Sequence, residues 1–450
     1  MKKGLLIAGA VLIAVLIAAA IYVNPLLEII TGYGAKGMAS GIFLSQREPE
    51  SIAENELDFS FIKYNQYNVD RKAGTVTAKF LWGKSTALYK DGYGCTVIRD
   101  FPADELRARP NIDPAKFSDY SANAYWPKGD RVHVSRFPEV NYNTLHNAVN
   151  AAFGDQPPYF GTRAVIVVYK DRIIAEKYAD GFNKDMPLLS WSMAKSMTNA
   201  LVGIMKKDGL IKSVKNPLPV KEWQNDRRKN ITWNDMMHMS SGQEWNENYG
   251  NLSDVTVMLH KVGDFGLYTL KKPLEDSIGT VWNYSSGSPN VLCRVMKDYF
   301  ETERDYYEYP YRKLFGPLGM SSAIFETDAS GIFVGSSYVY ATTRDYARFA
   351  MLYLNKGWWL GQQILPEGWT DYSSTPAAAS AGRYASYFWH NKAQDLLPDV
   401  PTDCYYCRGH DGQRIFIIPS KDMAVVRLGY SPKGSFDFNL FMKNILNAIE

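Results

Sequence analysis

The sequence predicts an α+β domain built on an antiparallel sheet, and three observations support this prediction. Residues 164–169 and 172–178 are two strand-like apolar runs joined by Lys170-Asp171, which is typical of a β-hairpin. Residues 414–418 and 423–428 form a second such pair across a short polar turn. Between the two pairs, apolar residues recur mostly at helical spacing. We therefore expect strands from both ends of this region to share one sheet, with helices packed on it.

The N-terminus predicts an export segment. Lys2 and Lys3 precede an unbroken apolar run over residues 4–23. Twenty helical residues at about 1.5 Å each span roughly the 30 Å hydrocarbon core of a bilayer. This length favours an uncleaved membrane anchor over a secretory signal, whose apolar part has about 7–15 residues. The small residues Ala18-Ala19-Ala20 keep a cleaved signal as the alternative. Residues 1–25 are predicted to be this anchor or signal, and the rest of the chain is then exported.

Residues 26–140 are predicted to form an accessory, β-rich extension. Residues 75–81 alternate between apolar and polar, and residues 85–89 and 95–98 follow after glycine-bearing turns, which indicates a short antiparallel meander. Residues 141–450 are predicted to form the main domain. It begins with a helix near residues 142–153 and the first hairpin. A helix that starts at Ser192 and stops at Gly209, a long helical insert over 210–385, the second hairpin and a final amphipathic helix follow.

The composition excludes several functions. The net charge is +3 and the chain has no basic block, so nucleic acid is not an expected partner. Four cysteines are too few for a disulfide scaffold, and neither they nor the six histidines have metal-ligand spacing. We expect no metal and no cofactor. Cys404 and Cys407 are interpreted as a local structural disulfide or as unpaired thiols.

The segment around Ser192 carries the main chemical signal. Ser192 and Lys195 lie three residues apart, so on a helix they share a face one turn apart. A desolvated lysine with a lowered pKa can take the proton of a serine hydroxyl and turn it into a nucleophile. Met197 and Leu201 continue an apolar stripe that would hold this helix rigidly. Ser192 would then lie at the helix N-terminus, where backbone N–H groups favour negative charge.

Two further segments complete the pattern. Tyr284 lies in Trp282-Asn283-Tyr284-Ser285-Ser286-Gly287, and a tyrosine beside a Ser–Lys pair can shuttle a proton. Residues 408–413 contain two glycines and lead directly into the strand at 414–418, so this backbone can approach a ligand closely. A free N–H there could pair with the N–H of Ser192 to hold a developing oxyanion.

In this order and spacing, the three segments resemble the serine β-lactamase and penicillin-binding-protein superfamily, in its class C-like branch. The resemblance covers residues 140 to 450 and rests on Ser192-x-x-Lys195, Tyr284-Ser285-Ser286 and His410-Asp411-Gly412. Other stretches resemble 6-aminohexanoate-dimer hydrolases and family VIII esterases: residues 237–242, Glu247-Asn248-Tyr249, and residues 340–345 and 364–369. The resemblance implies a β-lactamase/transpeptidase-like fold, an antiparallel sheet flanked by helices with a helical subdomain.

The resemblance also implies roles for individual residues. Ser192 is the expected nucleophile, Lys195 its proton acceptor, and Tyr284 the group that relays a proton to the leaving group. The backbone N–H groups of Ser192 and Gln413 are the expected oxyanion hole. Substrate contacts are expected from Tyr249, Ser286, His410, Asp411 and Gly412.

Two departures from the family pattern bear on the substrate. Ser286 replaces the asparagine of the usual Tyr-x-Asn, and Asp411 replaces a hydroxyl that helps bind a substrate carboxylate. An aspartate there tends to repel a carboxylate, which disfavours efficient β-lactam turnover.

The predicted function is therefore an exported, membrane-tethered serine hydrolase that cleaves small amides, esters or peptides. It is expected at a bacterial inner membrane, with the catalytic domain in the periplasm. Two alternatives remain open. One is a penicillin-binding D-alanyl-D-alanine carboxypeptidase or class C-like β-lactamase, and the other is an envelope sensor that is acylated without turnover.

Overall fold

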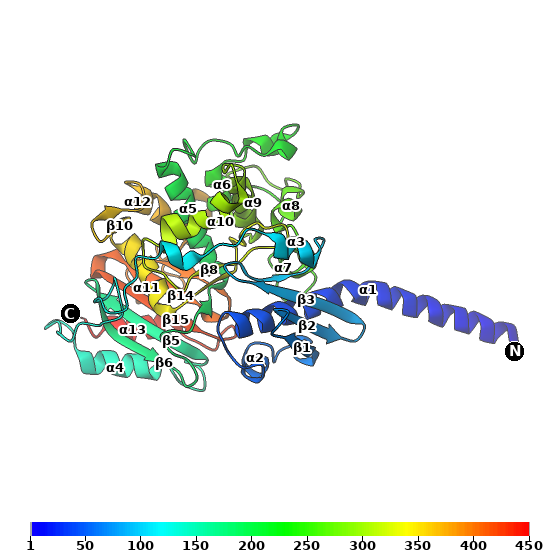
Figure 1. Cartoon of the computed structure of the whole chain (residues 1–450), viewed down its shortest axis with the longest axis horizontal. Coiled ribbons are helices and arrows are strands. Elements are labelled where there is room, and N and C mark those ends of the chain that lie inside the picture. Colours follow the sequence, from blue (N-terminus) through cyan, green and yellow to red (C-terminus); the bar gives the residue numbers. More distant parts are fainter. Residues whose placement is uncertain (1, 450) are drawn as a thin grey trace.

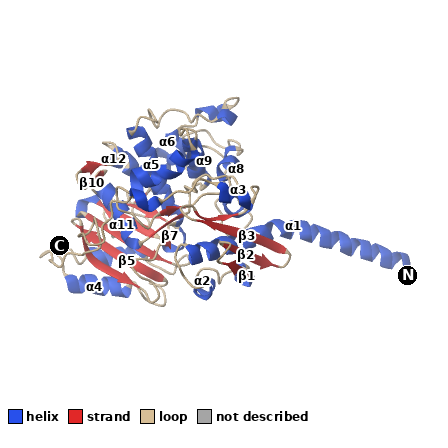
Figure 2. Ribbon diagram, in the orientation of Figure 1, coloured by secondary structure: helices blue, strands red, loops and turns tan. Residues whose placement is uncertain are grey.

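A six-stranded antiparallel sheet forms the centre of the molecule. The computed structural model describes residues 2–449. The strand order is β12-β13-β14-β15-β5-β6 (Figures 1 and 2). The two predicted hairpins, β5–β6 and β14–β15, lie side by side because β15 pairs with β5, which confirms that both ends of the domain build one sheet. The strands are β5 (Thr162–Tyr169), β6 (Arg172–Tyr178), β12 (Trp389–His390), β13 (Tyr405–Arg408), β14 (Arg414–Ile418) and β15 (Met423–Gly429).

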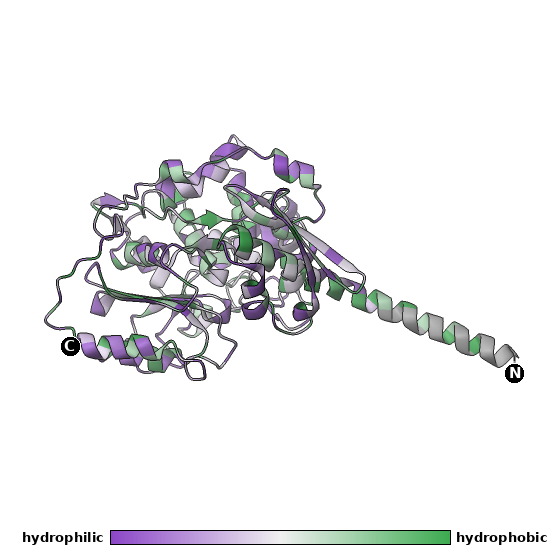
Figure 3. Ribbon diagram, turned by 60° about the horizontal axis from the view of Figure 1, so that its bottom comes forward, coloured by the Kyte–Doolittle hydropathy of each residue, from purple (hydrophilic) through white to green (hydrophobic). Residues whose placement is uncertain are grey.

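Helices cover both faces of this sheet. Ile166 and Val168 face one cluster of buried residues, which includes α5 (Ala194–Lys207) and α11 (Thr343–Leu354). Val165 and Val167 face the other, against α4 (Tyr142–Ala151) and α13 (Phe438–Leu446). Because successive strand residues point to opposite faces, a sheet buried on both sides needs continuous apolar runs, as these strands have. Figure 3 shows the corresponding pattern, with hydrophobic ribbon inside the body and hydrophilic ribbon towards its periphery.

The chain between β6 and β12 is mostly helical, as the sequence predicts for residues 210–385. It includes α5 and forms most of the upper part of the body in Figure 1. It also contains a small three-stranded sheet with the order β7-β9-β8. Its elements are β7 (Leu188–Leu189), α6 (Trp233–Met237), α7 (Asp254–Lys261), α8 (Phe265–Leu270), α9 (Gly287–Lys297), α10 (Glu303–Pro310), β8 (Ile324–Phe325), β9 (Val339–Ala341), β10 (Trp358–Trp359), β11 (Gln362–Gln363) and α12 (Trp369–Ser374).

The accessory region contains the predicted meander, and also a helix that the sequence analysis did not anticipate. A four-stranded antiparallel sheet has the order β1-β2-β3-β4. Helix α1 (Lys2–Phe43) crosses the predicted boundary at residue 25 without a break and packs on this sheet from Leu27 onward. Pro25 lies inside this helix. The remaining elements are α2 (Pro49–Asn55), β1 (Gln66–Asp70), β2 (Thr75–Phe80), β3 (Gly83–Lys90), β4 (Gly94–Val97) and α3 (Ala103–Ala108).

A buried carboxylate attaches this accessory region to the main domain. Glu326, which is 0% exposed, forms an ion pair with Lys36 of α1 and accepts hydrogen bonds from the Ser40 hydroxyl at 3.0 Å and the Cys95 N–H at 2.7 Å. A second ion pair joins Arg163 of β5 to Glu56 at 2.6 Å. Buried charges are tolerated when they are paired and hydrogen-bonded. The accessory region is therefore an integral part of the folded body.

The predicted membrane anchor is not confirmed by the structure. Among the described residues, no helix combines the length and the apolar character needed to cross a membrane. Most side chains of residues 4–23 lie outside the described residues, so the anchor stays a prediction.

The possible Cys404–Cys407 disulfide is wrong. Both cysteines are free and buried. Cys407 packs in the cluster on one face of the sheet and Cys404 in the cluster on the other. Residues three apart along a strand point to opposite faces, so the two sulfur atoms cannot meet. The alternative, unpaired thiols, is the one that the structure shows.

Candidate active site

Ser192 lies in a tight turn at the start of α5. A single 3₁₀ turn, Trp191–Met193, precedes the helix, and Trp191 has a φ of 46°, in the left-handed region that bulky residues rarely adopt. Met193, Met197 and Leu201 are 0% exposed and fix the turn and the helix in the core. The predicted stop at Gly209 is confirmed, since its φ is 79° and the helix ends at Lys207. The turn holds Ser192 partly exposed on a rigid base.

Lys195 is buried directly behind Ser192. Its Nζ atom donates to Ser192 Oγ at 2.9 Å, to Ser286 Oγ at 3.0 Å and to the Ser336 carbonyl at 2.9 Å. Burial disfavours the ammonium form and lowers the pKa of Lys195 from 10.5 to about 8, while the negative charge of Glu247 acts in the opposite direction. A lysine amine with this pKa, at hydrogen-bond distance from a serine hydroxyl, can accept its proton near neutral pH.

Ser286 links Lys195 to a carboxylate that the sequence analysis gave no role. The hydroxyl of Ser286 donates to Glu247 Oε1, and its backbone N–H donates to Glu247 Oε2 at 2.9 Å. Trp245 Nε1 also donates to Oε2, and the Tyr249 hydroxyl donates to Oε1 at 3.3 Å. Ser286 is 0% exposed. The residue that replaces the family's asparagine is therefore part of a chain from Lys195 to Glu247.

Tyr284 lies on the other side of the Lys195 amine. Lys195 Nζ is 4.9 Å from the centre of the Tyr284 ring. Burial, and secondarily the charge of Glu247, raise the pKa of the Tyr284 phenol, and the nearby Ser192 hydroxyl offsets part of this rise. Tyr284 is thus a neutral phenol near neutral pH, able to donate a proton and to accept one in return.

One open cavity brings most of the predicted site residues together. It is lined by Ser192, Tyr249, Tyr284, His410, Asp411 and Gly412, among others. The rings of Tyr249 and His410 stack with their centres 5.0 Å apart, and His410 Nε2 lies 3.2 Å from Asp411 Oδ1. Lys195 and Ser286 lie behind the wall of this cavity. The cavity thus brings the Ser192 hydroxyl and the Tyr284 phenol together with the turn at residues 410–412.

The two expected oxyanion donors are placed differently. The N–H of Ser192 has no hydrogen-bond partner among the described residues and is available to a ligand. The N–H of Gln413 bonds the His410 carbonyl at 3.4 Å, because residues 410–412 form a 3₁₀ turn. The Gln413 side chain is tied to Gly429 of β15, with Oε1 accepting from the Gly429 N–H at 3.0 Å. Gln413 lines an inner cavity and not the cavity of Ser192.

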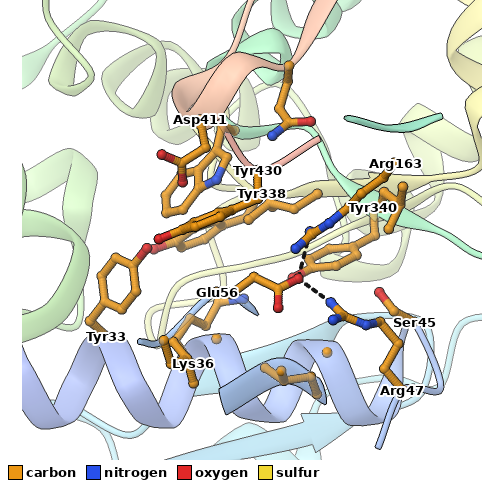
Figure 4. A pocket seen from close by; sticks show the side chains of 18 of the residues that line it. Tyr33, Lys36, Ser45, Arg47, Glu56, Arg163, Tyr338, Tyr340, Asp411 and Tyr430 are labelled. Atoms are coloured by element: carbon orange, nitrogen blue, oxygen red, sulfur yellow. Dashed lines mark hydrogen bonds and ion pairs between the residues drawn. The ribbon is translucent and has the colours of Figure 1, made fainter. Parts of the chain in front are cut away.

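The inner cavity lies between α1, α2 and the main sheet, behind Asp411 (Figure 4). Asp411 borders both cavities, and burial raises the pKa of its carboxyl. Glu56 holds Arg47 and Arg163 on one oxygen, while its other oxygen, His260 Nδ1 and Tyr338 OH have no hydrogen-bond partner within residues 2–449. The accessory region thus contributes polar side chains, such as Arg47 and Glu56, to a cavity that only Asp411 and its neighbours separate from the cavity of Ser192.

Three residues of the site were missed by sequence reasoning. Glu247 was noticed only as part of a similar stretch. Arg408 and Arg414 were named only as the start of the 408–413 segment and of the strand after it, without a role, although they flank the His410-Asp411-Gly412 turn and line the cavity. The sequence feature that could have identified the two arginines is their position: each is the strand residue nearest to the turn, Arg408 at the end of β13 and Arg414 at the start of β14. Pairing across the hairpin places Arg408 opposite Arg414.

Comparisons with known proteins agree with this geometry. A sequence model of the family described as Beta-lactamase matches residues 160–439. No curated protein sequence matches the chain.

Solved structures share the fold at low sequence identity. A Bacillus anthracis protein assigned as a 6-aminohexanoate-dimer hydrolase is 20% identical, with a TM-score of 0.51 over 70% of this chain and 86% of that one. A family VIII carboxylesterase is 14% identical, with a TM-score of 0.52 over 71% and 99%. A penicillin-binding protein from Bacillus halodurans is 15% identical, with a TM-score of 0.51 over 67% and 99%.

Proposed function

Because the chain belongs to the Beta-lactamase family, we propose that it is a serine hydrolase that cleaves small amides or esters through an acyl-enzyme on Ser192. The observation that carries this proposal is the 2.9 Å hydrogen bond between Lys195 Nζ and Ser192 Oγ, with Lys195 only 1% exposed. A buried, depressed-pKa amine in contact with a serine hydroxyl is what a Ser–Lys nucleophile requires. The same β-lactamase/transpeptidase-like fold in the esterase and hydrolase structures supports it.

In the proposed first half-reaction, Ser192 Oγ attacks the substrate carbonyl and its proton passes to neutral Lys195. The tetrahedral oxyanion accepts a hydrogen bond from the N–H of Ser192. The N–H of Gln413 bonds the His410 carbonyl, and we assign it no role in this step. Tyr284 then donates a proton to the leaving nitrogen or oxygen as the C–N or C–O bond breaks, and is reprotonated from Lys195.

In the second half-reaction, water attacks the acyl carbonyl and gives its proton to the Tyr284–Lys195 pair. The tetrahedral intermediate collapses, the bond to Ser192 Oγ breaks, and the serine recovers a proton. The Lys195–Ser286–Glu247 chain keeps the amine in position during both halves, since Ser286 accepts from Lys195 and donates to Glu247. Tyr249 and His410 form an aromatic wall for the bound substrate.

The decisive experiment is Ser192→Ala. Hydrolysis of p-nitrophenyl butyrate and of a linear amide should disappear, while the far-UV circular dichroism and the unfolding temperature stay within error. A fluorophosphonate should label the native protein on the peptide that contains Ser192. Ser190→Ala, a change at a buried serine two residues before Ser192, is a poor control because it alters packing. Ser277→Ala, at an exposed position that does not line the cavity, is the matched control. Equal labelling of Ser192→Ala and native protein would refute the proposal.

We further propose that residues 4–23 anchor the enzyme in the membrane and hold the catalytic body outside it. The support is the uninterrupted apolar run after Lys2 and Lys3. The protein should stay in the membrane fraction in 1 M salt, since burial of apolar side chains is not screened by salt. A mature protein that starts at Ile21 would instead show that Ala18-Ala19-Ala20 is cleaved.

A further inference from the structure

Two arginines lie side by side in the catalytic cavity without a counter-ion. Arg408 on β13 and Arg414 on β14 are cross-strand partners at the end of the hairpin. Among the described residues, no carboxylate lies within 4.0 Å of either guanidinium. Arg414 is 8% exposed and donates to two backbone carbonyls, Gly409 O at 3.0 Å and Gln413 O at 2.8 Å. These carbonyls are neutral acceptors and do not compensate its charge.

The guanidinium of Arg408 has still fewer polar partners than that of Arg414. Its side chain is half-buried over the ring of Trp389, with Cζ 4.7 Å from the ring centre, and donates no hydrogen bond within residues 2–449. Arg427, the next arginine across the sheet, provides a contrast. It is opposite Arg414 on β15, and its guanidinium donates to acceptors from four residues: Thr162, Gly412, Phe160 and Ser431. The hydrogen-bonding groups of Arg427 are therefore used within the protein, whereas those of Arg408 are not.

The proximity of these cations is unfavourable in the free protein. Burial, and then the charge of Arg408, lower the pKa of the Arg414 guanidinium to about 9. Two other buried arginines avoid this situation, since Arg344 pairs with Glu176 and Arg348 with Asp345. Buried charges are normally paired, and an unpaired set that faces a cavity is a candidate for binding an opposite charge.

Both guanidiniums border the space where a substrate must lie. They line the cavity that contains Ser192 and Tyr284, and also the adjoining groove with Leu396, Phe436 and Phe438. The ionised side chains that line the catalytic cavity are three cations and two carboxylates: Arg408, Arg414, Lys433, Glu247 and Asp411. The net charge of this lining is therefore +1. Asp411 belongs to the turn at residues 410–412, so the cavity has a negative position at the turn and a positive one along the strands.

We propose that Arg408 and Arg414 form an anion subsite that selects substrates in which a carboxylate or a phosphate is joined to the scissile group by an apolar arm. This inference rests on the proposed function, because it names the substrate class of the same site. A planar guanidinium can hold a carboxylate or phosphate through two parallel hydrogen bonds. The apolar side chains of the adjoining groove fit the hydrocarbon part of such a substrate.

Paired substrates test this selection. On the acyl side, mono-p-nitrophenyl glutarate is compared with p-nitrophenyl valerate, and on the leaving-group side 4-carboxyphenyl valerate with its neutral 4-carbamoyl analogue. One charged substrate should have a kcat/KM about tenfold above its neutral partner, and Arg408→Gln should reduce this ratio to about 1–2. Arg408→Lys should retain part of the preference. Lys433→Gln, an exposed cation at the same rim, should change the ratio less than about twofold.

A binding measurement separates this inference from the proposed function. Glutarate and inorganic phosphate are titrated calorimetrically into the full chain and into Arg408→Gln. Tighter binding of glutarate than phosphate assigns a carboxylate site, and the reverse order a phosphate site. Weaker binding of either anion to Arg408→Gln than to the native chain supports the subsite. If no ester is hydrolysed by either protein, that result refutes only the proposed function. The inference is overturned if neutral esters are hydrolysed as fast as charged ones, or if Arg408→Gln leaves both the ratio and the binding unchanged.

Discussion

Glu247 accepts hydrogen bonds from both the hydroxyl and the backbone N–H of Ser286, and Ser286 in turn accepts from Lys195. Glu247, which lies in a loop before α7, thus acts on Lys195 through Ser286. The negative charge of Glu247 raises the pKa of Lys195, against the larger effect of burial. This relationship gives the first two predictions.

The first prediction concerns the pH dependence of the native enzyme. Lys195 must be neutral to accept the Ser192 proton, and burial lowers its pKa from 10.5 to about 8. At pH 7 about a tenth of the enzyme then carries the neutral amine, and at pH 9 about nine tenths. The kcat/KM for an uncharged ester should rise between pH 6 and pH 9, with a midpoint near 8. A profile that is flat over this range would show that Lys195 is not the base.

The second prediction is that Glu247→Gln moves this midpoint to lower pH. The amide can keep the hydrogen-bonded geometry, but removal of the negative charge disfavours the ammonium form of Lys195, so its pKa falls. We expect a shift of about 0.5–1 pH unit in the kcat/KM profile. Glu244→Gln, at an exposed position three residues earlier, is the matched control and should shift nothing. A midpoint that stays in place or moves upward in Glu247→Gln would contradict this role.

The third prediction concerns Asp411 and β-lactams. Its carboxylate borders the catalytic cavity where related enzymes have a hydroxyl, so it repels the carboxylate of a cephalosporin. The native enzyme should hydrolyse short-chain esters faster than cephalosporins, and Asp411→Thr should raise the ratio of cephalosporin to ester kcat/KM about tenfold. Faster hydrolysis of cephalosporins than of esters by the native enzyme would show that Asp411 does not exclude them.

The fourth prediction concerns the ion pair between Lys36 and Glu326. Lys36→Met leaves the fully buried Glu326 carboxylate without its cation, which should lower the free energy of unfolding by about 3–5 kcal/mol. The double change Lys36→Met with Glu326→Gln should recover most of this loss, because no charge then remains buried. Urea unfolding followed by fluorescence measures both.

The control for that pair lies on the surface. Lys443 and Asp399 form an ion pair at 3.2 Å with side chains 46% and 38% exposed, so Lys443→Met should cost less than about 1 kcal/mol. Equal effects of the two lysine substitutions would mean that the Lys36–Glu326 contact does not hold the accessory region.

The fifth prediction concerns truncation. A chain that starts at Leu26 keeps the part of α1 that packs on β2 and β3, and should be folded and active. A chain that starts at Pro49 lacks this helix, exposes the apolar face that includes Val76 and Ala87, and should aggregate. Size-exclusion chromatography and ester hydrolysis compare the two. Full activity of the shorter chain would show that α1 is dispensable for the catalytic body.

Local patterns were sufficient to predict the elements of the main domain and its chemical motif. The β5–β6 and β14–β15 hairpins follow from apolar runs of strand length with turn residues between them, and α5 from a 3.6-residue stripe that begins beside Ser192. The Ser192–Lys195 contact is likewise local, since three residues of helix determine it. The continuation of α1 to Phe43 was not predicted, because its residues 27–43 are fixed by packing on β2, β3 and β4 rather than by a strong local pattern.

What the sequence by itself determined is therefore the fold class and the Ser192–Lys195 pair that we propose as nucleophile and base, because both depend on residues that are neighbours along the chain. Only the tertiary structure decided which distant groups act on them. Glu247 reaches Lys195 through Ser286, thirty-nine residues away from it in sequence, and Arg408 meets Arg414 without a counter-ion only because β13 and β14 pair in this register. Cys404 and Cys407 remain apart because a strand sends them to opposite faces. Interactions of this kind depend on distances between segments, which folding of the whole chain sets.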